Sequence, residues 1–169
     1  MNNIIFVHGL ESSGHGFKGN LFRKIIPKIL TPDFTPFSTK ISLEKLLQIR
    51  MSELENIAND KSDWIIIGSS FGGLMATIYA HKYLENVNLL ILLAPFLNTP
   101  LLQLNGYNQI DIPVIVFHGK KDIVVSLEKT QKIAKSLFTN LIYNIVDDDH
   151  QLQKTVSEID WSSLLSHNM

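Results

Sequence analysis

Three polar side chains in this sequence have the types and the order that nucleophilic catalysis requires. Ser70 lies at the centre of Gly68-Ser69-Ser70-Phe71-Gly72, which matches the pattern G-x-S-x-G. In that pattern a serine ends a strand and opens a helix on a tight turn, and the two glycines leave room for neighbouring backbone. Ser69 lacks this spacing, so Ser70 is the candidate nucleophile.

A serine hydroxyl becomes a strong nucleophile when a base takes its proton, and the base needs an acid to orient it. Asp122 and His150 follow Ser70 in the chain order serine, acid, histidine that accompanies this kind of turn. They come directly after two apolar runs that predict strands, Val114–His118 and Leu141–Val146. Because parallel strands end at one edge of a sheet, we expect the three side chains to converge there.

The other histidines and carboxylates fit these roles less well. His8 and His118 each precede a glycine at a predicted strand end, which favours a role in shaping a loop. Asp147, Asp148 and Asp149 lie too close to His150 in sequence to orient its ring. The remaining histidines lie in a loop, in a predicted helix and at the chain end: His15, His81 and His167. The alternative for Asp122 is that it caps a helix or lies in a solvated loop, and the alternative for His150 is that it lies in a solvated acidic loop.

Acyl transfer also needs two hydrogen-bond donors for the negative oxygen of its intermediate. We expect the backbone N–H of Phe71, directly after the nucleophile, and the N–H of Leu10, in the loop after the first strand. Residues 95–112 lack clear periodicity and are too few for a helical lid, which predicts an open apolar cleft above the serine. The candidate lining residues, for which core packing is the alternative, are Phe96, Leu97, Leu101 and Leu102.

The elements that must position these residues alternate between short apolar runs and helical patterns. The predicted strands are Ile4–His8, Trp64–Ile67, Leu89–Ala94, Val114–His118 and Leu141–Val146, with a weaker extended piece at Thr31–Phe37. The predicted helices are Phe17–Leu30, one capped by Ser42, Phe71–Leu84, one capped by Ser126, and Leu152–Leu165 with a possible break near Asp160. We therefore predict an α/β fold, a three-layer sandwich around a doubly wound, mostly parallel sheet of about six or seven strands. One domain is expected to span residues 1–169.

Composition narrows the classes of function. Hydrophobic residues make up 45% of the chain, charged residues 18%, and the net charge is −1, so nucleic acid is not expected as a partner. The absence of cysteine excludes disulfides, thiolate metal sites and a cysteine nucleophile. No phosphate-binding loop and no histidine pair with helical metal-ligand spacing occur, so no cofactor or metal is expected. The apolar runs are too short for a secretory signal or a membrane span, which predicts a cytoplasmic protein without stable membrane insertion.

With these residues identified, the chain resembles the α/β-hydrolase superfamily over nearly its full length. Two segments are similar to the small bacterial YqiA-like esterases: Phe6-Val7-His8-Gly9-Leu10-Glu11-Ser12-Ser13 and Gly68-Ser69-Ser70-Phe71-Gly72-Gly73-Leu74. The resemblance implies a compact fold without a lid domain and hydrolysis of a small-molecule carboxylic ester or acyl thioester. An acyltransferase or peptidase would use the same three residues. Non-catalytic alternatives are a binding protein on a hydrolase scaffold and a flavodoxin-like domain, and hydrolysis of an activated ester separates these from an enzyme.

Overall fold

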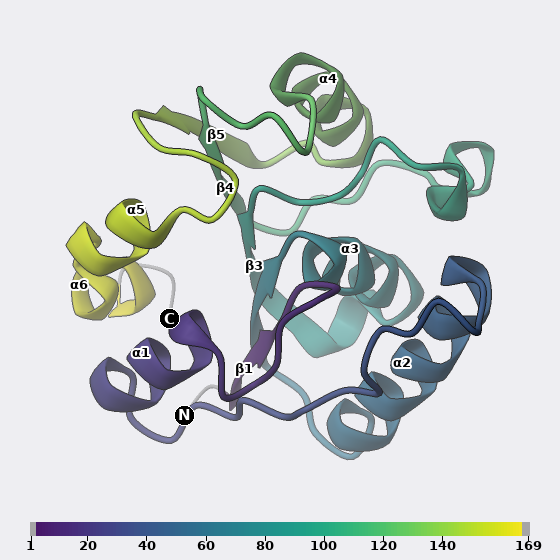
Figure 1. Ribbon diagram of the computed structural model, residues 1–169, viewed down its shortest axis with the longest axis horizontal. Helices are drawn as coiled ribbons and strands as arrows, with labels where there is room; N and C mark the ends of the chain where they lie inside the picture. Colours follow the sequence, from purple (N-terminus) through teal and green to yellow (C-terminus); the bar gives the residue numbers. More distant parts are fainter. Residues whose placement is uncertain (1–2, 167–169) are drawn as a thin grey trace.

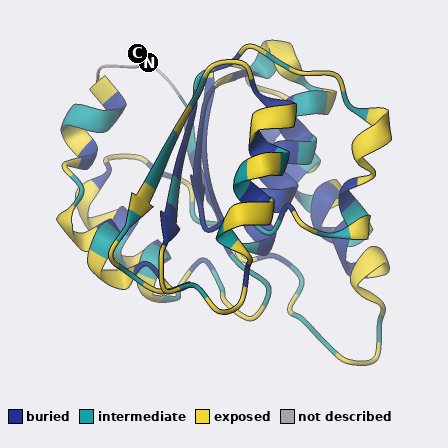
Figure 2. Cartoon of the chain, turned by 90° about the horizontal axis from the view of Figure 1, so that it is seen from above, coloured by how far each residue is buried: buried dark blue, intermediate teal, exposed yellow. Residues whose placement is uncertain are grey.

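A parallel five-stranded sheet forms the centre of the computed structural model, which describes residues 3–166 (Figure 1). The strands lie side by side in chain order: β1 (Asn3–Val7), β2 (Trp64–Ser69), β3 (Val87–Leu93), β4 (Val114–Gly119) and β5 (Leu141–Val146). Every residue of β2 is buried, as expected for an inner strand that is covered on both faces. The edge strand β5 is only partly buried (Figure 2).

Helices cover both faces of the sheet. One face carries α2 (Leu43–Ala58), α3 (Phe71–Lys82) and α4 (Leu127–Leu137), and the other carries α1 (Phe17–Ile25), α5 (Gln153–Glu158) and α6 (Trp161–Ser166) (Figure 1). Successive strand residues point to opposite faces, so Ile66 belongs to the first core and Ile65 and Ile67 belong to the second. The predicted three-layer α/β sandwich is confirmed.

The chain reverses its direction of winding at β1. After β1 it passes through α1 and returns along the outer edge of that strand, where Leu30 pairs with Ile5 in an isolated parallel bridge. It then crosses through α2, on the opposite face, to β2 on the other side of β1. The loops that leave β1 and β2 therefore turn toward opposite faces. Doubly wound sheets hold their sites in the crevice that this reversal opens at the carboxyl ends of the strands.

The sheet has fewer strands than the six or seven predicted. The segment Thr31–Phe37 was expected to be extended, and no part of it pairs as a strand. Pro32 and Pro36 have no N–H to donate, so this segment cannot sustain a hydrogen-bonded ladder. The pairing beside β1 is therefore confined to the single residue Leu30.

Two predicted helices are shorter than expected. The helix that starts at Phe17 ends at Ile25 rather than Leu30, because Pro27 disfavours helical backbone at the residue before it. The last predicted helix is divided into α5 and α6 at the expected place. There the carboxylate of Asp160 accepts a hydrogen bond of 3.0 Å from the backbone N–H of Ser163, which caps α6.

The connection between β3 and β4 carries no lid domain. Residues 94–113, all of them described, contain two short 3₁₀ turns, η2 (Pro100–Leu102) and η3 (Leu104–Gly106), and an isolated parallel bridge between Ile110 and Phe138. A third, η1 (Leu84–Asn86), links α3 to β3. Within residues 3–166, no helix has both the length and the apolar character needed to cross a bilayer.

Candidate active site

Ser70 occupies a strained turn between β2 and α3. Its backbone has φ 53° and ψ −114°, a region that residues with a side chain rarely adopt. The surrounding backbone holds it there, because its N–H donates to the carbonyl of Leu93 and its own carbonyl accepts from Phe96 and Gly73. Such strain costs about 1–3 kcal/mol and is found mainly at functional sites. The turn places the hydroxyl in the crevice between the ends of β1 and β2.

The two flanking glycines are required by close backbone contacts. A Cβ atom on Gly72 would lie 2.0 Å from the carbonyl oxygen of Val7, because the start of α3 passes directly over β1. A Cβ on Gly68 would lie 2.7 Å from the carbonyl oxygen of Gly72. Neither position can carry a side chain without displacing main chain, which is the steric reason for the G-x-S-x-G spacing.

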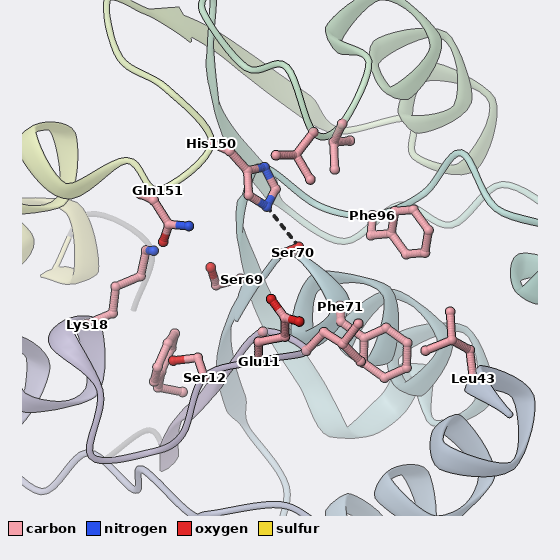
Figure 3. A pocket seen from close by; sticks show the side chains of 15 residues that line it. Glu11, Ser12, Lys18, Leu43, Ser69, Ser70, Phe71, Phe96, His150 and Gln151 are labelled. Carbon is pink, nitrogen blue, oxygen red and sulfur yellow. Dashed lines mark hydrogen bonds between the residues drawn. The ribbon is translucent and has the colours of Figure 1, made fainter. Parts of the chain in front are cut away.

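The structure brings Ser70, His150 and Asp122 together. His150 Nε2 lies 3.1 Å from Ser70 Oγ (Figure 3), and His150 Nδ1 lies 2.8 Å from Asp122 Oδ2. Because the carboxylate can only accept, Nδ1 carries the proton and Nε2 is left to accept the serine proton. The three residues come from loops after β2, β4 and β5, which meet at one edge of the sheet.

Asp122 is held as a buried carboxylate. Its side chain is fully buried, and Oδ1 accepts hydrogen bonds of 2.8 Å from the backbone N–H groups of Val124 and Val125. Burial alone would raise the pKa of Asp122, but the hydrogen bonds from Val125, His150 and Val124 outweigh it and hold that pKa below its usual value. The acid therefore stays ionised at neutral pH.

A second histidine also contacts Asp122. His118 Nε2 lies 3.1 Å from Asp122 Oδ2 and 3.2 Å from the carbonyl oxygen of Val125, so this nitrogen carries the proton. His118 Nδ1 then accepts from the hydroxyl of Tyr143, at 2.7 Å. Burial lowers the pKa of His118, whose ring stays neutral and supports the loop that carries Asp122.

The three aspartates that precede His150 are engaged elsewhere. Asp147 pairs with the Nζ atoms of Lys120 and Lys121 at 3.2 and 2.8 Å. Asp148 accepts from the N–H and the hydroxyl of Thr155, both at 2.8 Å. Asp149 accepts from the N–H of Gln151 at 2.8 Å. None of the three orients the ring of His150.

A cavity of about 520 Å³ lies beside Ser70. Phe96, one of the candidate lining residues, lines it, and so does Leu10 from the loop after β1. The other predicted lining residues do not: Leu97 and Leu102 are buried in the core on the α3 face, and Leu101 packs half-buried against that core. These three leucines therefore belong to the core packing that was the alternative for them.

The N–H groups of Leu10 and Phe71 have no hydrogen-bond acceptor among the described residues. Phe71 is the first residue of α3, where an N–H has no partner within its own helix. Both residues line the cavity beside Ser70. Two unsatisfied backbone donors therefore border the same space as the serine hydroxyl.

Arg50 supports this part of the site and was not anticipated from the sequence. Its fully buried guanidinium donates to the carbonyl oxygens of Gly9 and Leu10, at 3.2 and 2.9 Å. It also lies over the ring of Phe71, 5.5 Å from the centroid. The sequence feature that could have predicted its burial is its position in the apolar stripe of α2, four residues after Leu46 and four before Leu54. A charge in such a stripe is buried and needs partners.

His8 bonds to the same loop. Its ring is fully buried, Nδ1 lies 2.8 Å from the carbonyl oxygen of Gly9, and Nε2 accepts from the N–H of Phe34 at 3.0 Å. Burial lowers the pKa of His8, which keeps the ring neutral. Within residues 3–166, no group of three or more His, Asp or Glu side chains is arranged to hold a metal ion.

The sequence matches a family model, the alpha/beta hydrolase family, over residues 40–151. This region includes Ser70, Asp122 and His150 and covers more than half of the chain. The chain belongs to the alpha/beta hydrolase family. A search of curated protein sequences finds no match for this hydrolase, and the narrower likeness to YqiA-like esterases is tested by none of the matches.

Solved structures of other hydrolases share the fold of this one. Alpha/beta hydrolase domain-containing protein 10 from mouse is 16% identical, with a TM-score of 0.75, over 98% of this chain and 90% of its own. Est1E from Butyrivibrio proteoclasticus, solved with ferulic acid, is 14% identical, with a TM-score of 0.77, over 99% and 89%. An esterase from Pyrococcus furiosus is 17% identical, with a TM-score of 0.72, over 98% and 80%. At these identities the likeness is one of fold.

Proposed function

We propose that this hydrolase cleaves carboxylic esters or acyl thioesters through a covalent acyl-enzyme on Ser70, with His150 as base and Asp122 as orienting acid. The observation that carries the proposal is the continuous hydrogen-bonded path from Ser70 Oγ through the His150 ring to Asp122 Oδ2. A nucleophile, a base and an orienting group in this order form the arrangement that acyl transfer uses.

The proposed reaction has two steps. In the first, His150 Nε2 takes the Ser70 proton while Oγ attacks the carbonyl carbon, and the protonated ring then gives that proton to the leaving alcohol or thiol. In the second, His150 takes a proton from water, the resulting hydroxide attacks the acyl-enzyme, and the acid leaves as Oγ recovers its proton. Asp122 keeps Nδ1 protonated and stabilises the imidazolium that forms in each step.

The N–H groups of Leu10 and Phe71 are the proposed donors to the negative oxygen of each tetrahedral intermediate. Their lack of protein acceptors supports this role, because a donor that already has a partner would have to break that bond first. Arg50 and His8 both bond to the carbonyl oxygen of Gly9, and Arg50 also bonds to that of Leu10, which keeps one donor in position before substrate binds. The substrate is a small molecule that fits a cavity of about 520 Å³.

The test is covalent labelling together with turnover. A fluorophosphonate probe should add once to the wild-type protein, on Ser70, and p-nitrophenyl butyrate should be hydrolysed. Ser70→Ala should abolish labelling and lower kcat by on the order of 10⁶-fold, because the covalent intermediate can no longer form. Ser136→Ala, an exposed serine on α4, is the matched control and should behave as wild type. Labelling that persists in Ser70→Ala would refute the assignment.

A further inference from the structure

The cavity beside Ser70 has two chemically different sides (Figure 3). Aromatic and aliphatic side chains lie on one side: Leu43, Phe71 and Phe96. Polar side chains lie on the other: Ser12, Lys18, Ser69 and Gln151. Ser70 and His150 lie between the two groups. A substrate bound across Ser70 therefore meets an apolar surface at one end and hydrogen-bond donors at the other.

Among residues 3–166, Lys18 is the only lysine or arginine that lines this cavity. It lies in the first turn of α1, half-buried, and Figure 3 shows its amine beside the side chain of Gln151. Among residues 3–166 no acceptor lies within hydrogen-bond or ion-pair distance of its Nζ. A cation in the first turn is also disfavoured by the helix dipole, so helix stability does not explain it.

The acidic groups around Lys18 leave its charge unpaired. Asp148 and Asp149 attract it from the loop after β5, but their oxygens accept bonds from Thr155 and Gln151 of their own segment. Glu11 also lines the cavity, and Figure 3 shows its carboxylate between the polar and the apolar side chains, below Ser70. The residue is exposed, so water screens its charge. Burial lowers the pKa of Lys18 to about 8, against the attraction of the two aspartates, so the amine is mostly protonated at pH 7.

We propose that Lys18 binds an oxyanion group of the substrate, so that the hydrolase acts on esters or thioesters that are apolar on one side of the scissile bond and anionic on the other. The hydrolysis of such esters rests on the proposed function, whereas the binding of the oxyanion by Lys18 does not. Ser12, Ser69 and Gln151 line the same side of the cavity and offer neutral hydrogen-bond donors there, with Gln151 beside the amine (Figure 3). A half-buried, unpaired cation gains an ion pair when such a ligand enters, and a neutral ligand offers it nothing comparable.

Two pairs of esters test the proposal and locate the anion. The first pair carries the charge in the acyl part: mono-p-nitrophenyl glutarate and its methyl-capped counterpart. The second carries it in the leaving group: the butyrate ester of 4-hydroxybenzoate and that of methyl 4-hydroxybenzoate. Lys18→Met should lower kcat/KM for the anionic member of at least one pair by about 10- to 100-fold, mainly through KM. The neutral members should change by less than about threefold.

Matched variants separate charge from packing. Lys18→Arg should retain most of the preference for the anionic ester, because it keeps a cation at this position. Lys24→Met, on the exposed face of the same helix, should leave all four rates unchanged. If Lys18→Met leaves the anionic-to-neutral ratio unchanged in both pairs, or if wild type prefers the neutral member of both, the proposal is wrong.

A binding measurement makes the result independent of turnover. Monomethyl glutarate and dimethyl glutarate are titrated by NMR into Ser70→Ala and into Ser70→Ala combined with Lys18→Met. The Kd for the monoester should be about 10- to 100-fold weaker in the double variant, and that for the diester should not change. Lys18-dependent binding without hydrolysis in wild type would overturn the proposed function alone. Equal Kd values, or no binding of the monoester, would overturn the oxyanion site.

Discussion

Two histidines contact the same carboxylate oxygen in this hydrolase, and their surroundings differ. His150 and His118 both approach Asp122 Oδ2, at 2.8 and 3.1 Å. The His150 side chain is 13% exposed, and its second nitrogen faces the Ser70 hydroxyl in the cavity. The His118 side chain is fully buried, and its second nitrogen accepts from the hydroxyl of Tyr143, a half-buried residue. One ring borders the space where a substrate would bind, and the other has only protein around it.

The comparison shows that a histidine–aspartate contact does not define a catalytic base. A base must exchange a proton with a reacting group, which requires a free lone pair at a cavity. His150 has that lone pair on Nε2. The Nε2 proton of His118 faces two acceptors, and its Nδ1 already has a donor. Burial raises the pKa of Tyr143, so the phenol keeps the proton that it donates. The second nitrogen decides the role.

The largest expected effect on kcat comes from replacing each of the two histidines, His150 and His118, by glutamine. His150→Gln should lower kcat for p-nitrophenyl butyrate by on the order of 10⁶-fold, because in the proposed reaction His150 takes the Ser70 proton. His118→Gln should cost far less activity. It should lower the free energy of unfolding by about 1–3 kcal/mol, because buried partners lose a hydrogen bond. Ester hydrolysis and urea unfolding of both variants measure the difference.

The comparison fails if the two variants behave alike. A loss of kcat in folded His118→Gln as large as that in His150→Gln would place both rings in the reaction. Circular dichroism at the assay temperature establishes that each variant is folded before the rates are compared.

The next largest effect concerns the residue that the two rings share. Asp122→Asn should lower kcat by on the order of 10⁴-fold, because an amide can donate to Nδ1 and so stabilise the wrong tautomer of His150. It should also destabilise the fold, because His118 loses the same acceptor. Asp111→Asn, an exposed carboxylate bonded to Thr139 near the start of β4, is the control and should retain activity. A kcat for Asp122→Asn within tenfold of wild type would contradict the assigned acid.

The smallest expected effect is the contribution of His118 to the pH dependence of the free energy of unfolding. Burial holds the pKa of His118 in the folded protein below 6.5, the usual value for a histidine. Its contribution to stability is therefore present above pH 6.5 and is lost as the pH falls below it. His8 and His81 have lowered pKa values for the same reason and add to the loss. His118→Gln should reduce the slope of unfolding free energy between pH 6.5 and 5 by up to about 1.4 kcal/mol per pH unit. Identical slopes in urea unfolding of wild type and variant would show that His118 is not buried as a neutral ring.

Much of the fold follows from local patterns that the sequence displays. The five apolar runs became the five strands, because a segment buried on both faces must be apolar throughout. The extra strands did not form, because two prolines remove donors from the one remaining extended segment. Pro27 marked the end of α1 in the sequence, although the apolar spacing that runs past it suggested a longer helix. Here a local steric rule prevails over periodicity.

The sequence by itself determined the turn around Ser70, the chain order of the three polar residues and their places after strands. These depend on local sterics and on the common direction of parallel strands. Only the tertiary structure decided which leucines line the cavity, that Arg50 and His8 support the Leu10 loop, and that Lys18 reaches the cavity unpaired. It also showed that His118, in β4, contacts the same carboxylate as His150 while its second nitrogen accepts from Tyr143. Those distinctions depend on which atoms from distant segments fill the space around each side chain, and spacing along the chain does not carry that information.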